Sequence, residues 1–183
     1  LICKKWKRYN KLPDAIIVEG PLSGGHQGFT YEQCIQEEFQ LENIIGPIIE
    51  EAKEWGDIPI IAAGGIWDKK DIDKFLAMGC SGVQMATRFI GTFECDADAN
   101  FKNVLLNAKA EDIQLMKSPV GLPARGVMTN LQAKIVGYCI ADRLGAAYNG
   151  DVETGLFFSG SNGYRIEKII SVKELMEKLT KGE

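Results

Sequence analysis

The stretch that decides the fold is "IPIIAAGGIWDKKDIDKFLAMGCSGVQMA", residues 58–86. It begins with a short apolar run, Ile58–Ala63, which ends at the glycine pair Gly64–Gly65. A helical pattern follows at Lys69–Gly79, and a second apolar run lies at Gly82–Ala86. Short apolar runs without alternation are typical of strands buried on both faces, as in a parallel sheet. The stretch therefore predicts a strand, a helix and a second, parallel strand.

The same alternation extends on both sides of this unit. A further apolar run, Ala15–Val18, precedes a helix at Leu41–Trp55 whose apolar residues recur at helical spacing. On the C-terminal side, helices are expected at Asp96–Ala108, near Leu131–Tyr148 and at Ser171–Leu179. Repeating strand–helix units are typical of an α/β fold. Three or four units are too few for a closed eight-stranded barrel, which needs about 200–250 residues. The chain is then either a small open sheet or one end of a barrel.

Composition limits the classes of partner and compartment. The chain has 183 residues, a net charge of −4 and no long basic run, which argues against nucleic acid. Its five cysteines are scattered singly, which argues against a disulfide framework and a metal site and fits a reducing cytosol. No run approaches the roughly 18 apolar residues of a membrane span. We expect a cytoplasmic protein with no membrane partner and, because no methionine starts the sequence, a piece of a longer chain.

Glycine-rich or small-residue segments follow all three expected strands. "EGPLSGGHQG" follows Val18, "GGI" follows Ala63 and "ATRFIG" follows Met85. Glycine at the end of a strand lets the backbone approach a ligand and direct N–H groups at it. A following helix adds the positive end of its dipole. Two successive loops of this kind predict a phosphate-binding cup, although Gly64–Gly65 taken alone also suit a tight strand-to-helix turn.

Two familiar nucleotide motifs do not fit these loops. The loop from Gly20 to Gly25 is spaced like a Walker loop, but His26 and Gln27 stand where lysine and serine or threonine are needed. A G-x-G-x-x-G fingerprint is absent from the sequence. His26 is the single histidine of the chain, and imidazole ionises near neutral pH. It is interpreted either as an acid or base group or as a hydrogen-bonded part of a glycine turn.

Three segments in order carry a resemblance to a known family. "VEGPLSGGHQGF", the stretch from Ile58 to Ala97 and "KSPVGLPARGVMTN" resemble the C-terminal half of the nitronate monooxygenases, formerly called 2-nitropropane dioxygenases. The FMN-dependent enoyl-acyl-carrier-protein reductases II are close relatives. The resemblance runs from Cys3 to Leu179 and implies the C-terminal part of a TIM (β/α)8 barrel, strands six to eight with their helices. Residues 1–130 would belong to the barrel, and residues 131–183 would form a helical extension packing on it.

The resemblance also implies roles for individual residues. His26 corresponds to an active-site base or substrate-orienting group beside the flavin, and Arg88 would add charge near the phosphate. Ser23 and Ala86 replace an alanine and a glycine of many relatives, which makes the backbone contact of Ala86 the least secure. The segment Ser118–Asn130 either borders the substrate or is an ordinary surface loop. The residues expected to bind FMN are Glu19, Gly24, Gly64, Gly65, Gln84, Met85, Ala86 and Thr87.

The implied activity is that of an FMN-dependent oxidoreductase acting on a small molecule. A nitronate monooxygenase oxidises nitronates or nitroalkanes with O2 to carbonyl compounds and nitrite. The alternative is reduction of an enoyl thioester by NAD(P)H through FMN, and a third is an inactive fragment of either enzyme. Three strands alone would expose sheet edges, which predicts self-association, with a homodimer as one form.

Overall fold

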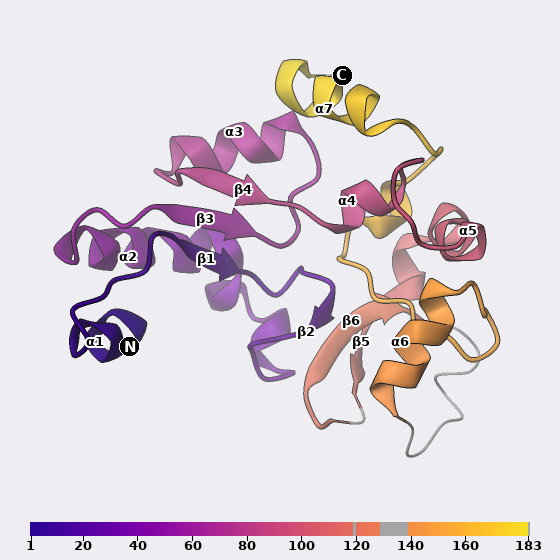
Figure 1. Cartoon of the computed structure of the whole chain (residues 1–183), viewed down its shortest axis with the longest axis horizontal. Coiled ribbons are helices and arrows are strands. Elements are labelled where there is room, and N and C mark those ends of the chain that lie inside the picture. The colour runs from indigo at the N-terminus through magenta and orange to yellow at the C-terminus, as the bar shows by residue number, and fades with distance from the viewer. Residues whose placement is uncertain (119, 129–138, 183) are drawn as a thin grey trace.

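The structure is a computed structural model and describes residues 1–118, 120–128 and 139–182. The first sheet has three parallel strands in the order β1, β3, β4 (Figure 1). These are β1 (Ile16–Glu19), β3 (Ile60–Ala63) and β4 (Gly82–Gln84). The prediction of parallel strands connected by helices is confirmed, and the strands end at one edge of the sheet.

Helices on one face of this sheet form the main core. They are α2 (Leu41–Glu54) and α3 (Lys69–Ala77). Ile45 and Ile49 of α2 pack with Ile60 and Ala62 of β3 in one buried cluster, because the apolar residues of the helix recur on a single stripe. Helix α3 ends before Gly79, whose φ of 100° lies in the left-handed region that glycine adopts without strain.

A second sheet, absent from the sequence prediction, lies beside the first. It is antiparallel, in the order β2, β6, β5, and consists of β2 (Gly25–His26), β5 (Ile113–Lys117) and β6 (Pro123–Val127). The interpretation of Ser118–Asn130 as a loop is therefore wrong over Pro123–Val127. This strand reads "PARGV", and proline, alanine and glycine have low strand propensity, so the local sequence hides it.

The remaining helices lie around these two sheets. They are α1 (Ile2–Lys7), α4 (Thr87–Ile90), α5 (Ala99–Asn107), α6 (Ile140–Tyr148) and α7 (Val172–Lys181). Of the helix expected near Leu131–Tyr148, the part from residue 131 to 138 lies outside the described residues. Figure 1 shows α7 running over α3, which it contacts. In the described ranges, no helix has both the length and the apolar character needed to cross a membrane.

Three of the single cysteines differ in their burial. Cys34 and Cys80 are buried, whereas Cys95 is half-buried. Cys80 follows α3 and packs in the cluster between α2, α3 and the parallel sheet. Small apolar thiols suit this tightly packed layer.

Candidate functional site: a glycine-lined pocket at the strand ends

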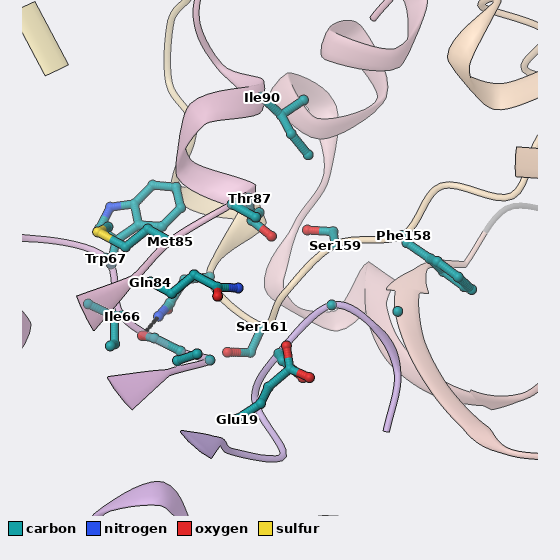
Figure 2. A pocket seen from close by; sticks show the side chains of 18 residues that line it. Glu19, Ile66, Trp67, Gln84, Met85, Thr87, Ile90, Phe158, Ser159 and Ser161 are labelled. Carbon is teal, nitrogen blue, oxygen red and sulfur yellow. Dashed lines mark hydrogen bonds between the residues drawn. The ribbon is translucent and has the colours of Figure 1, made fainter. Parts of the chain in front are cut away.

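A pocket of about 240 Å³ lies at the carboxyl ends of the parallel strands (Figure 2). All eight residues expected to bind the cofactor line it, and they come from the carboxyl ends of β1 and β4, the loops that follow the strands and the start of α4. These residues are Glu19, Gly24, Gly64, Gly65, Gln84, Met85, Ala86 and Thr87. Because parallel strands end at the same edge of a sheet, loops distant in sequence meet here.

The loop after β3 needs both of its glycines. Gly64 and Gly65 have φ values of 92° and 79°, in the left-handed region. A Cβ atom on Gly64 would lie 2.9 Å from the Gly20 carbonyl oxygen, and one on Gly65 would lie 3.0 Å from the Leu22 side chain. Any other residue would therefore strain the backbone and push against the neighbouring loop.

The same loop presents unused hydrogen-bond donors. Within residues 1–118, 120–128 and 139–182, the backbone N–H groups of Gly64, Gly65 and Ile66 donate to no other atom of the chain. The N–H groups of Ala86 and Thr87, at the start of α4, are likewise unused in these ranges. Buried or half-buried amides without partners cost free energy, so converging amides of this kind are typical of anion sites.

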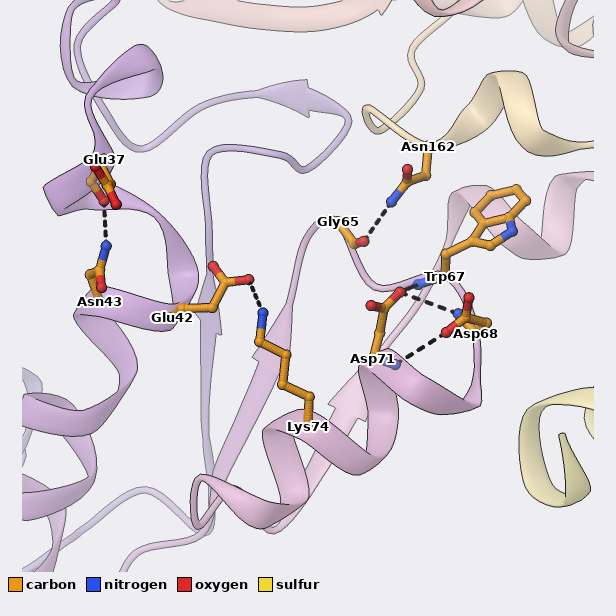
Figure 3. A network of polar contacts seen from close by, with 9 residues as sticks. All are labelled: Glu37, Glu42, Asn43, Gly65, Trp67, Asp68, Asp71, Lys74 and Asn162. Carbon is orange, nitrogen blue, oxygen red and sulfur yellow. Dashed lines mark hydrogen bonds and ion pairs between the residues drawn. The ribbon is translucent and has the colours of Figure 1, made fainter.

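A C-terminal segment closes the pocket, and sequence reasoning did not assign it. Part of the cavity lining comes from Phe158, Ser159, Ser161 and Asn162, far along the sequence from β1. The Asn162 side chain donates to the Gly65 carbonyl at 2.6 Å (Figure 3). The repeated glycines and serines of "FSGSNG" were the available signal, but only the fold shows which loop they approach.

Two close contacts fix this segment, one against the start of α4 and one against the loop after β1. The backbone N–H of Gly160 donates to the Thr87 hydroxyl oxygen at 2.9 Å. The Thr87 hydroxyl proton thus stays available to donate into the pocket. A Cβ atom on Gly24 would lie 2.6 Å from the Gly160 nitrogen, so the two backbones touch there.

Glu19 is the acidic group of the pocket. Glu19 as a whole residue is exposed, but partial burial of its carboxyl raises the pKa of that group above the usual value, and a hydrogen bond from Ser23 opposes this rise. The hydroxyl of Ser23 therefore has an electrostatic role at this carboxyl. Ser23 also lies 3.5 Å from the Gln27 side-chain oxygen.

His26 lies next to this pocket rather than in its lining. Its Nε2 atom is 2.7 Å from the Ser118 hydroxyl oxygen. Its ring packs edge-on against Phe158, with the ring centroids 5.4 Å apart, and Phe158 is part of the pocket wall. In β2, His26 pairs with Ala124 of β6, so a strand rather than a free loop orients the imidazole.

Two buried polar side chains hold the loop that carries His26. The Gln27 amide donates to the carbonyls of Ser23 and Gly25 at 2.9 Å and 3.2 Å. The Arg125 guanidinium donates to the Pro21 carbonyl at 3.0 Å. Burial lowers the pKa of Arg125, which is consistent with its place in the interior. The backbone of the glycine loop is thereby fixed before any ligand binds.

Comparisons with known proteins show the family of the chain. A family model described as nitronate monooxygenase matches residues 1–182. The chain belongs to the nitronate monooxygenase family. A probable nitronate monooxygenase of Staphylococcus saprophyticus is 28% identical over 183 residues, covering 92% of this chain and 50% of that protein. The corresponding protein of Staphylococcus aureus strain JH9 is 30% identical, over 81% of this chain and 45% of its own.

Solved structures place this member of the family in the same fold. FabK from Thermotoga maritima, as an M276A mutant, is 30% identical with a TM-score of 0.74, covering 98% of this chain and 54% of that one. Nitroalkane oxidase from Streptomyces ansochromogenes is 25% identical with a TM-score of 0.70, covering 98% and 54%. The chain thus shares their α/β fold and spans about half the length of these relatives.

One expected site residue of this family member lies elsewhere. Arg88 follows Thr87 directly, but its side chain turns away and stacks on Trp67, with 4.4 Å between the guanidinium carbon and the ring centroid. Arg88 is not part of the pocket lining. It lines a second pocket instead, which shares Trp67 with the first. The expectation that Arg88 adds charge at the glycine cup is therefore not met by this geometry.

Proposed function

We propose that this chain provides the cofactor-binding half of an FMN-dependent oxidoreductase of the nitronate monooxygenase type. In this proposal β1, β3 and β4 are the sixth, seventh and eighth strands of a TIM barrel. The observation that supports it best is the single pocket lined by all eight residues expected to bind FMN. The backbone N–H groups after β3 and β4, which have no acceptor within the described residues, support it independently.

The pocket fits the phosphate end of FMN by its donors. The amides of Gly64, Gly65, Ala86 and Thr87 would bind phosphate oxygens, and the Thr87 hydroxyl would add one more hydrogen bond. Backbone amides suit this role because they carry no net charge and are fixed before binding. The bound flavin would supply the redox centre, accepting electrons from the substrate.

Polar groups on the other side of the pocket suit the rest of the cofactor. Glu19 and Gln84 are exposed at the strand ends and line the cavity (Figure 2). They provide a carboxyl group and an amide to hydrogen-bond the polar edge of a ring or the hydroxyls of a ribityl chain. Gly24 packs closely against Gly160, so the loop after β1 has no side chain at this position that would obstruct a flavin ring.

His26 would handle the proton that the substrate loses or shares. The Ser118 hydroxyl oxygen also accepts the Val120 backbone N–H at 3.3 Å, so its own proton can donate to His26 Nε2. In that arrangement the neutral imidazole carries its proton on Nδ1, and the ring is fixed by Ser118 on one side and Phe158 on another. A fixed imidazole near the pocket is suited to general acid–base catalysis.

The experiment separates the proposed activity from its alternatives. The whole enzyme that the proposal assigns to this chain is saturated with FMN and given a nitronate without NAD(P)H while oxygen uptake is followed. We expect nitronate-dependent uptake. Rapid NAD(P)H oxidation with a crotonyl thioester, and none of that uptake, would instead assign enoyl reduction. A chain that stays colourless with excess FMN would refute the flavin site itself.

A matched glycine pair tests the cup. Gly65→Ala should weaken FMN binding about tenfold or more, because a Cβ atom would lie 3.0 Å from the Leu22 side chain and shift Gly65, which lines the pocket. Gly121→Ala is the control, since Gly121 has a similar φ of 85° but no atom within 4 Å of its Cβ position. Equal FMN affinity in the two variants, measured by quenching of flavin fluorescence, would contradict the assignment of Gly65.

A further inference from the structure

A second cavity, of about 330 Å³, shares Trp67 with the glycine-lined pocket, and four of its eight lining residues are cations. Arg88 comes from α4, Arg165 and Lys168 from the segment before α7, and Lys178 from α7 itself. These side chains converge from three parts of the chain. None of them lines the glycine pocket.

Two of the four cations are held in place by one buried ring. Trp67 is 4% exposed, and the guanidinium carbons of Arg88 and Arg165 lie 4.4 Å and 5.3 Å from its ring centroid. Asp68 fixes Arg165 further through an ion pair of 3.2 Å. Asp68 is itself fixed, because it caps α3 by accepting the Asp71 backbone N–H (Figure 3). Planar guanidinium groups held this way lose little freedom when they bind an anion.

The lining of this cavity holds more cations than carboxylates, although the chain is acidic. It contains four cations and one carboxylate, Glu167, and two further carboxylates pair with lining cations, Asp68 with Arg165 and Glu174 with Lys168. The Lys168–Glu174 pair is long, at 3.6 Å, and its side chains are 70% and 43% exposed. Exposed ion pairs of this kind contribute little to the free energy of folding, so Lys168 can leave Glu174 and bind a ligand at a small cost in free energy.

We propose that this cavity binds a nucleoside diphosphate, with the diphosphate held by Arg88, Arg165, Lys168 and Lys178. Arginine and lysine together are the side chains that recognise phosphate groups. The volume exceeds what a single phosphate fills and approaches that of small-ligand pockets. Tyr164 lines the same cavity and is 39% exposed, which leaves a ring face for a planar base. This site is separate from the proposed flavin pocket and does not rest on it.

The test titrates pyrophosphate and ADP into the chain by calorimetry, with FMN present in excess so that the glycine cup is blocked. Lys168→Gln and Lys178→Gln, made separately, should each weaken binding of both probes about tenfold. Lys173→Gln, an exposed lysine of α7 outside the cavity, is the charge-matched control and should change nothing. Tyr164→Leu should remove the higher affinity for ADP over pyrophosphate.

Each other outcome overturns the proposal in a defined way. Equal weakening by Lys173→Gln would show unspecific attraction to positive charge. Binding that occurs without FMN and disappears with it would place the anion in the glycine cup. Equal affinity for ADP and pyrophosphate would remove the nucleotide assignment. Gly65→Ala, which should bind FMN more weakly, should keep ADP binding, so failure of the flavin pocket is distinguishable from failure of this site.

Discussion

At the scale of single residues, Glu19 gives the clearest pH-dependent prediction. Because its pKa is raised in the folded chain, folding holds its proton more tightly than the unfolded chain does. The stabilising contribution of the protonated form is full below the ordinary carboxyl pKa of about 4.3 and is lost as the pH rises through the folded value.

Glu19→Gln should therefore raise the free energy of unfolding at neutral pH relative to the wild type. The difference should shrink as the pH falls below about 4.3, where Glu19 is protonated in both states. Urea denaturation at a series of pH values checks this, with the exposed Glu177→Gln on α7 as the control. A difference that stays constant across pH would show that burial of this carboxyl has no electrostatic cost.

His26 carries the catalytic part of the proposal at this scale. In a chain that turns over nitroalkanes, His26→Asn should lower turnover by roughly 10²–10⁴-fold, as expected for a lost acid or base group, and leave FMN affinity unchanged. Ser118→Ala should lower turnover less and should alter its pH profile, since Ser118 contacts Nε2 at 2.7 Å. Steady-state oxygen uptake measures both. Wild-type turnover in His26→Asn would remove this residue from the mechanism.

The residues that sequence reasoning found share one property. Gly64 and Gly65 directly follow β3, and Thr87 lies shortly after β4, so local sequence was enough to place them at a sheet edge. Phe158 and Asn162 could not be found in this way, because their role depends on packing against loops about 70–140 residues away. Arg88 shows the reverse error, since proximity in sequence to Thr87 did not determine where its long side chain points.

At the scale of elements, the contact between the loop after β1 and residues 159–160 is the closest backbone approach at the pocket. Gly24→Ala should destabilise the fold by about 1–3 kcal/mol, because its Cβ would lie 2.6 Å from backbone atoms that cannot rotate away. Gly28→Ala, with no atom within 4 Å of the Cβ position, is the matched control. Chemical denaturation of the two variants should differ; equal midpoints would mean that the C-terminal segment is not tightly docked.

The parallel elements were predictable and the antiparallel sheet was not. Apolar runs such as Ile60–Ala63 are long enough to show a buried strand, and the capping residues Asp68 and Ser171 mark helix starts. Strand β2 has two residues and pairs with a segment about 100 positions away. A strand this short has no periodicity, and tertiary pairing rather than propensity forms it.

At the scale of the whole molecule, helices cover one face of the parallel sheet more fully than the other. The sheet β1–β3–β4 is covered by α2 and α3 on one face, while Ile17 on the other face is 54% exposed. The chain spans about half the length of the relatives it matches. Both facts fit the proposal that these strands form one side of a barrel whose inner face other strands would cover.

The central claim is that the strand ends bind the phosphate of a flavin, and a comparison of FMN with riboflavin tests it most directly. The two differ in the phosphate alone, so fluorescence titration of the purified chain isolates the contribution of the glycine cup. We expect FMN to bind about a hundredfold more tightly than riboflavin, because its phosphate would accept several hydrogen bonds as a charged group. Equal affinity for FMN and riboflavin would contradict it.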